Sequence, residues 1–564
     1  MKFSQMQYSR IDMREFEEKF NSHLQNFINA ESAQDQVNAI NKINELRNDF
    51  DTNKVLSFIN YSIDTSNEQF NKDQEFYDEN TPLYQNLIAK FYLALTNSNF
   101  RKALENYLGR HLFDIAEKLL KTFDPIIIED LKKENHLGSD YVKLKASALV
   151  DFDGKKLNLM DLEPYMENPD REIRKKAFEV YWKYFEDNKS KFDDIYDQLV
   201  KIRTDMALKL GYKNFTELGY ARMKRTDYNA EMVANFREEV KKYVVPLATS
   251  LRERQTKRLG LDKMYYYDTF LQFKTGNPTP KGTPEWIIDQ GKEMYRNLSI
   301  ETGTFFDFMM NNELMDVYSR KGKADMGYCE YIPNYKSPFI FANMNGTEGD
   351  ITVLTHEAGH AFQAYSSRDF KVKEYMEPTM ETAEIHSMSM EFLTWDYMKL
   401  FFNGDTEKFK FSHLNGAILI IPYLTLVDDF QHHIYENPSL TPDQRNSLWR
   451  KLEKEYMPHL DYADNSYLEN GGRWQRQGHI YEVPFYYIDY ALAQICAFQF
   501  WKLSKEDKDI ALEKYIFLCK EGGSKSFTTL LKSVGMKSPF DKDTVKEVIA
   551  DAGNWLNSID DSRF

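Results

Sequence analysis

Cysteine is scarce in this chain, and long apolar runs are absent. Its 564 residues include 3 cysteines, and these three, Cys329, Cys496 and Cys519, are widely spaced. Such usage is typical of a reducing compartment and argues against a disulfide framework or a zinc site built from cysteines. The longest apolar run, Ala417 to Val427, is interrupted by Pro422 and is far shorter than the roughly 20 residues of a transmembrane helix.

Basic residues are also fewer than acidic residues. The 73 Lys and Arg stand against 88 Asp and Glu, which gives a net charge of −15. No basic stripe interrupts this balance, and this argues against nucleic acid as a partner. The N-terminal segment lacks the continuous apolar stretch of a secretory signal. We therefore expect a cytoplasmic protein with neither a nucleic-acid nor a membrane partner.

Helical spacing of apolar residues dominates the first part of the chain. Thr81 followed by Pro82 is typical of a helix start, with an N-cap and a proline in the first turn. Residues 168–170 (Asn-Pro-Asp) predict a further helix start, residues 152–155 (Phe-Asp-Gly-Lys) a hairpin turn, and residues 277–282 a loop. Two sets of apolar residues carry the helical pattern: Val37, Ile40, Leu46 and Phe50, then Leu83, Leu87, Phe91 and Leu95.

Residues 1–190 contain no cluster of metal-binding side chains. We expect them to form an N-terminal helical lobe that walls a cleft, and we expect residues 191–564 to form a catalytic domain. A chain of 66.7 kDa is large enough to bury a sizeable core and to enclose such a cleft.

The most informative segment is His356-Glu357-Ala358-Gly359-His360. On a helix, His356 and His360 lie about 6 Å apart on one face, so that both imidazoles can bind one Zn²⁺. Glu357 follows the first histidine, where it can act as general base toward a water held by the metal. With 11 His in the chain, this pattern arises by chance in roughly one sequence in fifty. The alternative is a pair of solvated histidines on a helix face.

A strand is predicted before this motif, over Phe339 to Met344, and an Asn345-Gly346 turn follows it. Asp350 is then a candidate N-cap of the helix that carries the motif. An open strand edge beside such a site binds extended peptides through main-chain hydrogen bonds. We therefore expect Phe341 and Asn343 to contact substrate. An ordinary buried strand is the alternative.

A catalytic zinc site needs a third protein ligand, and a second predicted helix offers two candidates. Glu384 and Glu391 lie two turns apart on one face of this Met- and Phe-rich helix. A carboxylate in apolar surroundings is costly unless it is paired or bound to metal. We assign Glu384 as the third ligand and Glu391 as the acceptor that orients a ligand histidine, although spacing alone also allows the reverse. His386 projects differently from Glu384 and is expected either to support a ligand residue or to be structural, and not to bind the metal.

The segments HEAGH and ETAEIHSMSMEFL, with FIFANMNGT upstream and HIYEVPFYYIDYALAQ downstream, make the chain similar to the thimet oligopeptidase and oligoendopeptidase F family of zinc metallopeptidases. The resemblance extends from about residue 200 to the C-terminus, and more weakly through the N-terminal part. It implies a mainly α fold in which two helical lobes enclose a deep substrate channel, with a small β-sheet beside the motif helix. It also implies one Zn²⁺ per chain held by His356, His360 and Glu384, with Glu357 as general base.

The family's next signature, a histidine followed by tyrosines, is matched by His479 and four tyrosines. A hydroxyl or imidazole aimed at a developing oxyanion stabilises the transition state by roughly 3–4 kcal/mol. Tyr487 and Tyr490 are at positions i and i+3, so we rank them as catalytic beside His479, and we rank Tyr481 and Tyr486 as substrate-binding. An aromatic helix that packs in the core is the alternative for this stretch.

These residues predict a zinc-dependent endopeptidase that cuts short unstructured peptides. A zinc carboxypeptidase or dipeptidyl carboxypeptidase is the alternative within the class, and an inactive peptide-binding scaffold is the alternative outside it. The intact set of metal-binding residues argues against the scaffold. Three glycines close to the histidine, Gly471, Gly472 and Gly478, predict a hinged loop, with a plain surface turn as the alternative.

Overall fold

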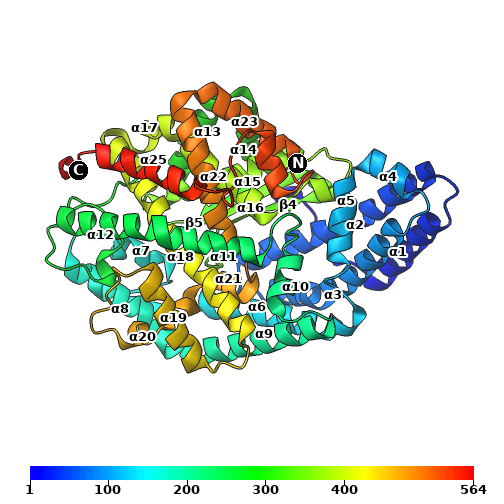
Figure 1. The fold of residues 1–564 in the computed structure, drawn as a ribbon, viewed down its shortest axis with the longest axis horizontal. Helices are drawn as coiled ribbons and strands as arrows, with labels where there is room; N and C mark the ends of the chain where they lie inside the picture. The colour runs from blue at the N-terminus through cyan, green and yellow to red at the C-terminus, as the bar shows by residue number, and fades with distance from the viewer.

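Five helices form the N-terminal end of the molecule in the computed structural model, which describes residues 1–564. Their apolar faces make a core of their own, in which Phe16, Phe50 and Phe91 are almost fully buried. Asp12 and Ser32 cap the first two helices by accepting hydrogen bonds from first-turn amides. Figure 1 shows this group in blue at one end of the molecule: α1 (Met13–Ile28), α2 (Ala33–Ile63), α3 (Glu68–Thr96), α4 (Arg101–Leu108) and α5 (Arg110–Leu119).

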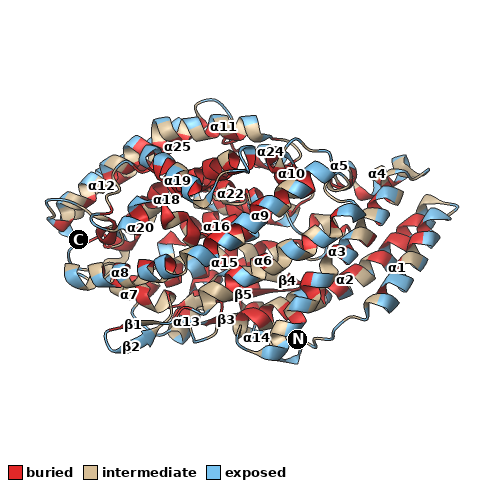
Figure 2. Ribbon diagram, turned by 90° about the horizontal axis from the view of Figure 1, so that it is seen from below, coloured by how far each residue is buried: buried red, intermediate tan, exposed pale blue.

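The rest of the chain is also mainly helical, which confirms the expected fold class, and it shares one large core that extends from Leu56 to Leu556. Figure 2 shows buried residues gathered along α16 and α22 in the middle of the molecule. The lobe boundary near residue 190 stays a prediction. The helices are α6 (Ile128–Ala146), α7 (Glu163–Met166), α8 (Arg171–Asp187), α9 (Lys189–Lys209), α10 (Phe215–Arg222), α11 (Ala230–Glu239), α12 (Val245–Leu259), α13 (Pro284–Leu298), α14 (Ile300–Asn311), α15 (Gly349–Ser367), α16 (Met380–Leu393), α17 (Lys399–Phe402), α18 (Thr406–Glu436), α19 (Pro442–Tyr456), α20 (Ser466–Glu469), α21 (Gly478–Glu482), α22 (Tyr487–Glu506), α23 (Lys508–Glu521), α24 (Phe527–Ser533) and α25 (Thr544–Ser558).

Two small sheets complete the fold. β1 (Val150–Phe152) and β2 (Lys155–Leu157) form the predicted hairpin. The second sheet has the order β3-β5-β4, in which β5 (Ser337–Met344) runs parallel to β3 (Met315–Tyr318) and antiparallel to β4 (Tyr328–Ile332). The predicted strand before the motif is therefore the central strand of this sheet. Both of its edges are paired, so the expectation that this strand offers a free edge to substrate is wrong.

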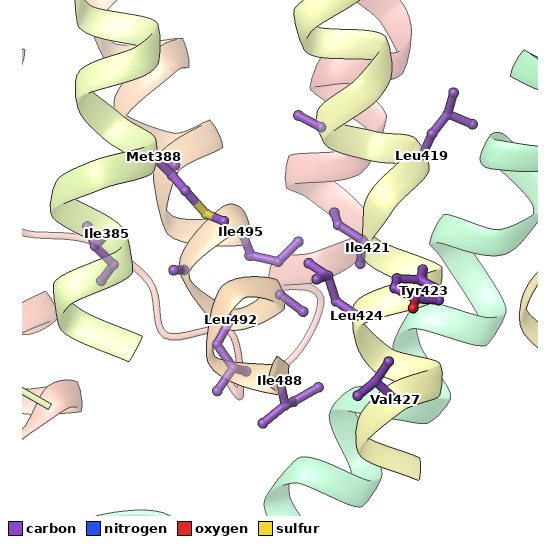
Figure 3. Packing of buried hydrophobic residues seen from close by; sticks show 14 of the residues in the cluster. Ile385, Met388, Leu419, Ile421, Tyr423, Leu424, Val427, Ile488, Leu492 and Ile495 are labelled. Carbon is purple, nitrogen blue, oxygen red and sulfur yellow. The ribbon is translucent and has the colours of Figure 1, made fainter. Parts of the chain in front are cut away.

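Three helices pack together in the middle of the large core, and Figure 3 shows their contact. α22 lies between α16 and α18, so that Met388 of α16 lies near Ile495 of α22, and Leu424 of α18 lies on the opposite side of α22. Fully burying each of these side chains contributes about 1.5–3 kcal/mol. This packing fixes the relative positions of the helices that carry the predicted metal and tyrosine residues.

α18 contains the longest apolar run of the sequence. It is the one helix long and apolar enough to cross a membrane by length and composition, but most of it is buried inside the protein. Pro422 lies inside this helix without ending it. This apolar run therefore forms a helix of the protein core.

Two sequence-based helix boundaries are wrong. Pro82 lies inside α3 and does not open a helix, because the apolar face of the whole 29-residue helix packs against neighbouring helices and outweighs the lost hydrogen bond. Asp350 is in the first turn of α15, and Glu348 is the N-cap residue. The Asp350 carboxylate instead accepts hydrogen bonds from the backbone amides of Asn345 and Gly346, at 2.9 Å each. By contrast, Asp170 caps α8 as predicted.

The motif helix α15 and the next helix α16 approach each other very closely at Gly359. A Cβ atom at this position would lie 2.5 Å from the carbonyl oxygen of His386 and 2.6 Å from the Cα of Ser387. Both of these are backbone atoms, which cannot move aside without shifting α16. Glycine at the fourth position of the motif therefore sets the distance between the two helices.

We predict that Gly359→Ala lowers the free energy of unfolding by about 1–3 kcal/mol, because the added methyl overpacks the contact between the helices. Gly416→Ala is the matched control, since Gly416 lies inside α18 and a Cβ atom added there would meet no other atom within 4 Å. That change is expected to raise stability by about 0.5–1 kcal/mol. Urea denaturation of both variants measures the effect, and equal stabilisation by the two substitutions would refute the close contact.

Candidate metal centre

Three side chains from α15 and α16 converge on one point. The Nε2 atoms of His356 and His360 lie 3.2 and 3.4 Å from Glu384 Oε2. All three potential ligand atoms lie within 4.8 Å of one another, so that one ion can contact all of them. This arrangement follows from the i, i+4 spacing on α15 and from the close approach of α16 at Gly359.

Glu384 is fully buried and yet held in its ionised form. Burial alone raises the pKa of a carboxyl group, but the neighbouring His360 and His356 hold the pKa of Glu384 well below its usual range. Ser387 Oγ donates to Glu384 Oε2 at 2.8 Å, and the Tyr486 hydroxyl donates to Oε1. Two imidazole nitrogens and one oriented carboxylate match the His₂Glu donor set of catalytic zinc sites.

Glu391 lies behind this set and not within it. His356 donates through Nδ1 to Glu391 Oε1 at 2.7 Å, and its Nε2 atom faces the other donors. This geometry gives Glu391 the orienting position that we assigned from the sequence. The second oxygen of Glu391 accepts from His413 Nε2 at 2.7 Å, and Trp395 Nε1 donates to His413 Nδ1 at 3.1 Å.

His413 is a member of the site that sequence reasoning missed. It belongs to α18, and no local spacing links it to the motif. Only the tertiary arrangement of α16 and α18 brings it to Glu391.

His386, in contrast, is fully buried, and burial lowers its pKa to about 3. Its ring contacts Tyr515 and not the donor set, in agreement with a structural role.

Glu357 is the buried carboxylate left free beside the three donors. Only 6% of the residue is exposed, and its Oε2 atom has no hydrogen-bond partner. Burial raises its pKa above the ordinary value of a glutamate. A Cβ atom at Gly327 would lie 3.4 Å from Glu357 Oε1, so glycine at that position leaves room beside the carboxylate. An unpartnered buried carboxylate next to a set of metal donors fits a proton acceptor.

His479 and two tyrosines face the donor set from α21 and α22. His479 Nε2 lies 3.2 Å from the Tyr490 hydroxyl, and Gln477 Nε2 donates to His479 Nδ1 at 2.8 Å. Burial lowers the pKa of His479 to about 4, so the imidazole is neutral at pH 7. With Nδ1 accepting from Gln477, the proton resides on Nε2, on the side of Tyr490. The Tyr487 ring packs on His479 with centroids 4.7 Å apart.

Three residues predicted to bind substrate have other contacts. Tyr481 is fully buried, stacks on Tyr141 with ring centroids 4.0 Å apart, and is a core residue. Phe341 is also fully buried within the small sheet. Asn343 Nδ2 donates to the backbone carbonyls of Ala324 and Met326, at 2.9 and 3.0 Å, and so fastens a loop. The assignments of Tyr481 and Phe341 are corrected, because sequence position alone did not show which face of each element is covered. A contact between the half-buried Asn343 and substrate stays a prediction.

Tyr486 and the glycines have contacts that the sequence did not reveal. Tyr486 donates its hydroxyl to the Glu384 carboxylate and so supports a metal-binding residue, and its contact with substrate stays a prediction. The predicted hinged loop is tightly packed instead. A Cβ atom would lie 2.0 Å from the Asn446 carbonyl oxygen at Gly471 and 2.4 Å from the Tyr467 ring at Gly472.

The fold and the site define a helical protein with a His-His-Glu metal centre of the metallopeptidase kind. A sequence model of the peptidase M3 N-terminal domain matches residues 3–123, and a model of peptidase family M3 matches residues 164–280 and 297–549. The chain belongs to peptidase family M3.

Solved structures agree with this assignment. The chain is similar to Pz peptidase A, solved with an inhibitor, at 53% identity and a TM-score of 0.99 over 100% of both chains. It is also similar to a putative oligoendopeptidase F from Bacillus anthracis, at 49% identity and a TM-score of 0.95 over 100% of this chain and 99% of that one. Oligopeptidase PepF of Bacillus subtilis is 26% identical over 409 residues, which is 70% of this chain but only 58% of the length of that relative.

Removal of the Glu384 side chain and removal of the Glu391 side chain are expected to have different effects on zinc binding. Glu384→Ala deletes one of the three convergent donors and is predicted to abolish most zinc binding. Glu391→Ala leaves all three donors and removes only the orientation of His356, so zinc affinity is expected to fall by roughly 10–100-fold. Zinc titration of the metal-free variants measures both effects. Full zinc affinity in Glu384→Ala would show that the wrong carboxylate is assigned as ligand.

Proposed function

We propose that this protein is a zinc-dependent endopeptidase that hydrolyses internal bonds of short, unstructured peptides. The observation that carries the proposal is the free, buried Glu357 carboxylate beside the convergent His356, His360 and Glu384. The names of the similar proteins, Pz peptidase A and oligoendopeptidase F, support the same activity. A cytoplasmic location also remains our proposal.

A Zn²⁺ ion held by His356, His360 and Glu384 supplies Lewis-acid chemistry, because it acidifies water and polarises the peptide carbonyl. Glu357 accepts a proton from the attacking water and later delivers it to the leaving amine. Burial raises its pKa above the ordinary value of a glutamate, which makes it a better proton acceptor. Its Oε2 atom has no hydrogen-bond partner that competes for this proton.

His479 and Tyr490 are the residues placed to bind the oxyanion. Neutral His479 carries its proton on Nε2, and the Tyr490 hydroxyl lies 3.2 Å from this atom. Both groups can donate to an oxygen beside the metal donors without a change of charge. Such donors stabilise the transition state more than the substrate. Tyr487 packs against His479 and Tyr423 and keeps the imidazole in place.

The limited exposure of the site favours small peptides over folded proteins as substrates. The side chains of His356 and His360 keep 19% and 18% of their surface exposed, although their neighbours on α15 and α16 are mostly buried. An extended chain reaches such a recessed site, whereas a folded domain does not. The enclosing channel between two lobes is part of this proposal.

Peptides blocked at both ends test the proposal and its alternatives. An endopeptidase cuts them internally, whereas a carboxypeptidase or dipeptidyl carboxypeptidase needs a free C-terminus. Mass spectrometry of the products, with and without a chelator, identifies the cut bond. No cleavage of any peptide by the zinc-loaded protein would favour the inactive scaffold and refute the proposed activity.

Glu357→Gln separates the proton acceptor from the metal ligands. The amide keeps the shape of the side chain but cannot accept a proton. We expect hydrolysis to fall by several orders of magnitude while bound zinc stays at one per chain. Peptide turnover and metal content, measured on the same preparation, check this expectation. Turnover near that of the wild type would remove Glu357 from the mechanism.

Tyr490→Phe tests oxyanion binding. Removal of this hydroxyl is expected to lower kcat by roughly 10²–10³ with little change in KM, zinc content or thermal stability. Tyr481→Phe is the matched control, because Tyr481 is a core residue whose hydroxyl donates at 3.4 Å to the carbonyl of Phe192. Its kcat is expected to stay constant. Equal kcat in Tyr490→Phe and the wild type would leave oxyanion binding to His479 and the metal.

A further inference from the structure

The hydrogen bonds of His413 end at a donor that cannot change its role. An indole N–H only donates, so Trp395 Nε1, at 3.1 Å, requires His413 Nδ1 to be the acceptor. In the neutral imidazole the proton then resides on Nε2. That atom lies 2.7 Å from Glu391 Oε2, which needs a donor. Trp395 and Glu391 therefore require the same tautomer and the same ring orientation of His413.

The Glu391 carboxylate is held at both of its oxygens. His356 Nδ1 lies 2.7 Å from Oε1, and His413 Nε2 lies 2.7 Å from Oε2. A carboxylate with one donor on each oxygen cannot rotate about its last bond without the loss of a charge-assisted hydrogen bond. Its Oε1 atom therefore stays directed at His356, whose Nε2 faces the other metal donors.

Aromatic rings surround His413 and keep water from replacing it. Its side chain is 5% exposed, and that of Glu391 is 10% exposed. The ring centroids of Phe392, Phe409 and Trp395 lie 4.8, 5.6 and 5.8 Å from that of His413. In such surroundings a carboxylate oxygen that loses its donor stays without a partner, which is costly. The geometry of Glu391 therefore depends on His413.

We propose that His413, with its orientation fixed by Trp395, is a positioning residue of the metal centre. It holds the Glu391 carboxylate in the orientation that directs His356 Nε2 to the ion, and so it increases the affinity for zinc. His413 acts through Glu391 and is not itself one of the three convergent donors. The inference rests on the proposed function, because it needs Zn²⁺ at those donors.

The zinc affinity of the metal-free protein, measured by competition with a chelator, tests the inference without any substrate. His413→Phe keeps a ring and removes both hydrogen bonds. We expect its Kd for zinc to rise about three- to tenfold, which is less than the effect of losing Glu391 itself. His413→Gln can place an amide N–H where Nε2 donates to Glu391, so it should recover most of the affinity.

Phe409→Leu is the matched control. Phe409 lies one turn before His413 on α18, and its ring stacks on the imidazole without a hydrogen bond. The lost packing should lower thermal stability, while zinc affinity should stay at the wild-type value. An unchanged Kd in His413→Phe, or an equal rise in Phe409→Leu, would overturn the inference while the proposed activity stands. A wild-type centre that binds no zinc would instead count against the proposed function.

The roles of Trp395 and of the His413 proton are tested separately. Trp395→Phe should weaken zinc binding less than His413→Phe does, because Glu391 keeps its donor, and an unchanged Kd would overturn the role of Trp395. ¹⁵N NMR of the zinc-loaded protein with labelled histidine locates the proton, since the signals of His413 are those missing from His413→Phe. We expect the proton on Nε2. A proton on Nδ1 would overturn the inference, because Nδ1 could then not accept from Trp395.

Discussion

The burial of the Glu384 carboxylate is the constraint on which the rest of the site depends. Removal of a carboxylate from water costs several kcal/mol unless opposite charge and hydrogen bonds replace the water. Here the replacement comes from His356, His360, Ser387 and Tyr486. The two histidines reach the carboxylate because Gly359 lets α16 approach α15 at backbone contact distance. The metal centre therefore forms only if α15 and α16 make this close contact.

A second set of buried charges places the residues that face the metal donors. Arg225 Nη2 donates to the Phe485 carbonyl at 2.6 Å and to Asp489 Oδ1 at 2.7 Å. Phe485 has a φ of 68°, a conformation that costs a bulky residue about 1–3 kcal/mol. The salt bridge holds this conformation in place. As a result the chain turns sharply before α22, and Tyr486 points to Glu384 while Tyr490 points to His479.

The segment before this turn is fixed from another helix. Arg203 of α9 is fully buried and donates from Nη1 to the carbonyl of Ile480 at 3.0 Å, and from Nη2 to the carbonyl of Tyr481. Its Nε pairs with Glu134 of α6 at 2.6 Å. Hydrogen bonds of this kind are strong in a low-dielectric interior. The position of His479 therefore depends on helices from distant parts of the sequence.

Local spacing explains what could be read from the sequence. The separation of His356 and His360 depends only on helix geometry. The rule that a carboxylate in apolar surroundings must be paired or metal-bound then leaves Glu384 and Glu391 as the candidates for the third ligand. The roles of the tyrosines could not be read in this way, because the positive φ of Phe485 breaks the helical phase between Tyr481 and Tyr490. His413 and Gly359 were missed for another reason, because their importance arises from the packing of helices that are separate in the sequence.

The choice of arginine beside His479 also follows from burial. Burial lowers the pKa of Lys323 to about 8, even though Asp316 accepts a hydrogen bond from it. Arg252 lies next to other arginines and has no carboxylate partner, yet its pKa is still about 10. Because a guanidinium has a higher ordinary pKa than a lysine ammonium, it keeps more of its charge under the same burial. A cation that must stay charged in this recessed region is therefore best provided by arginine.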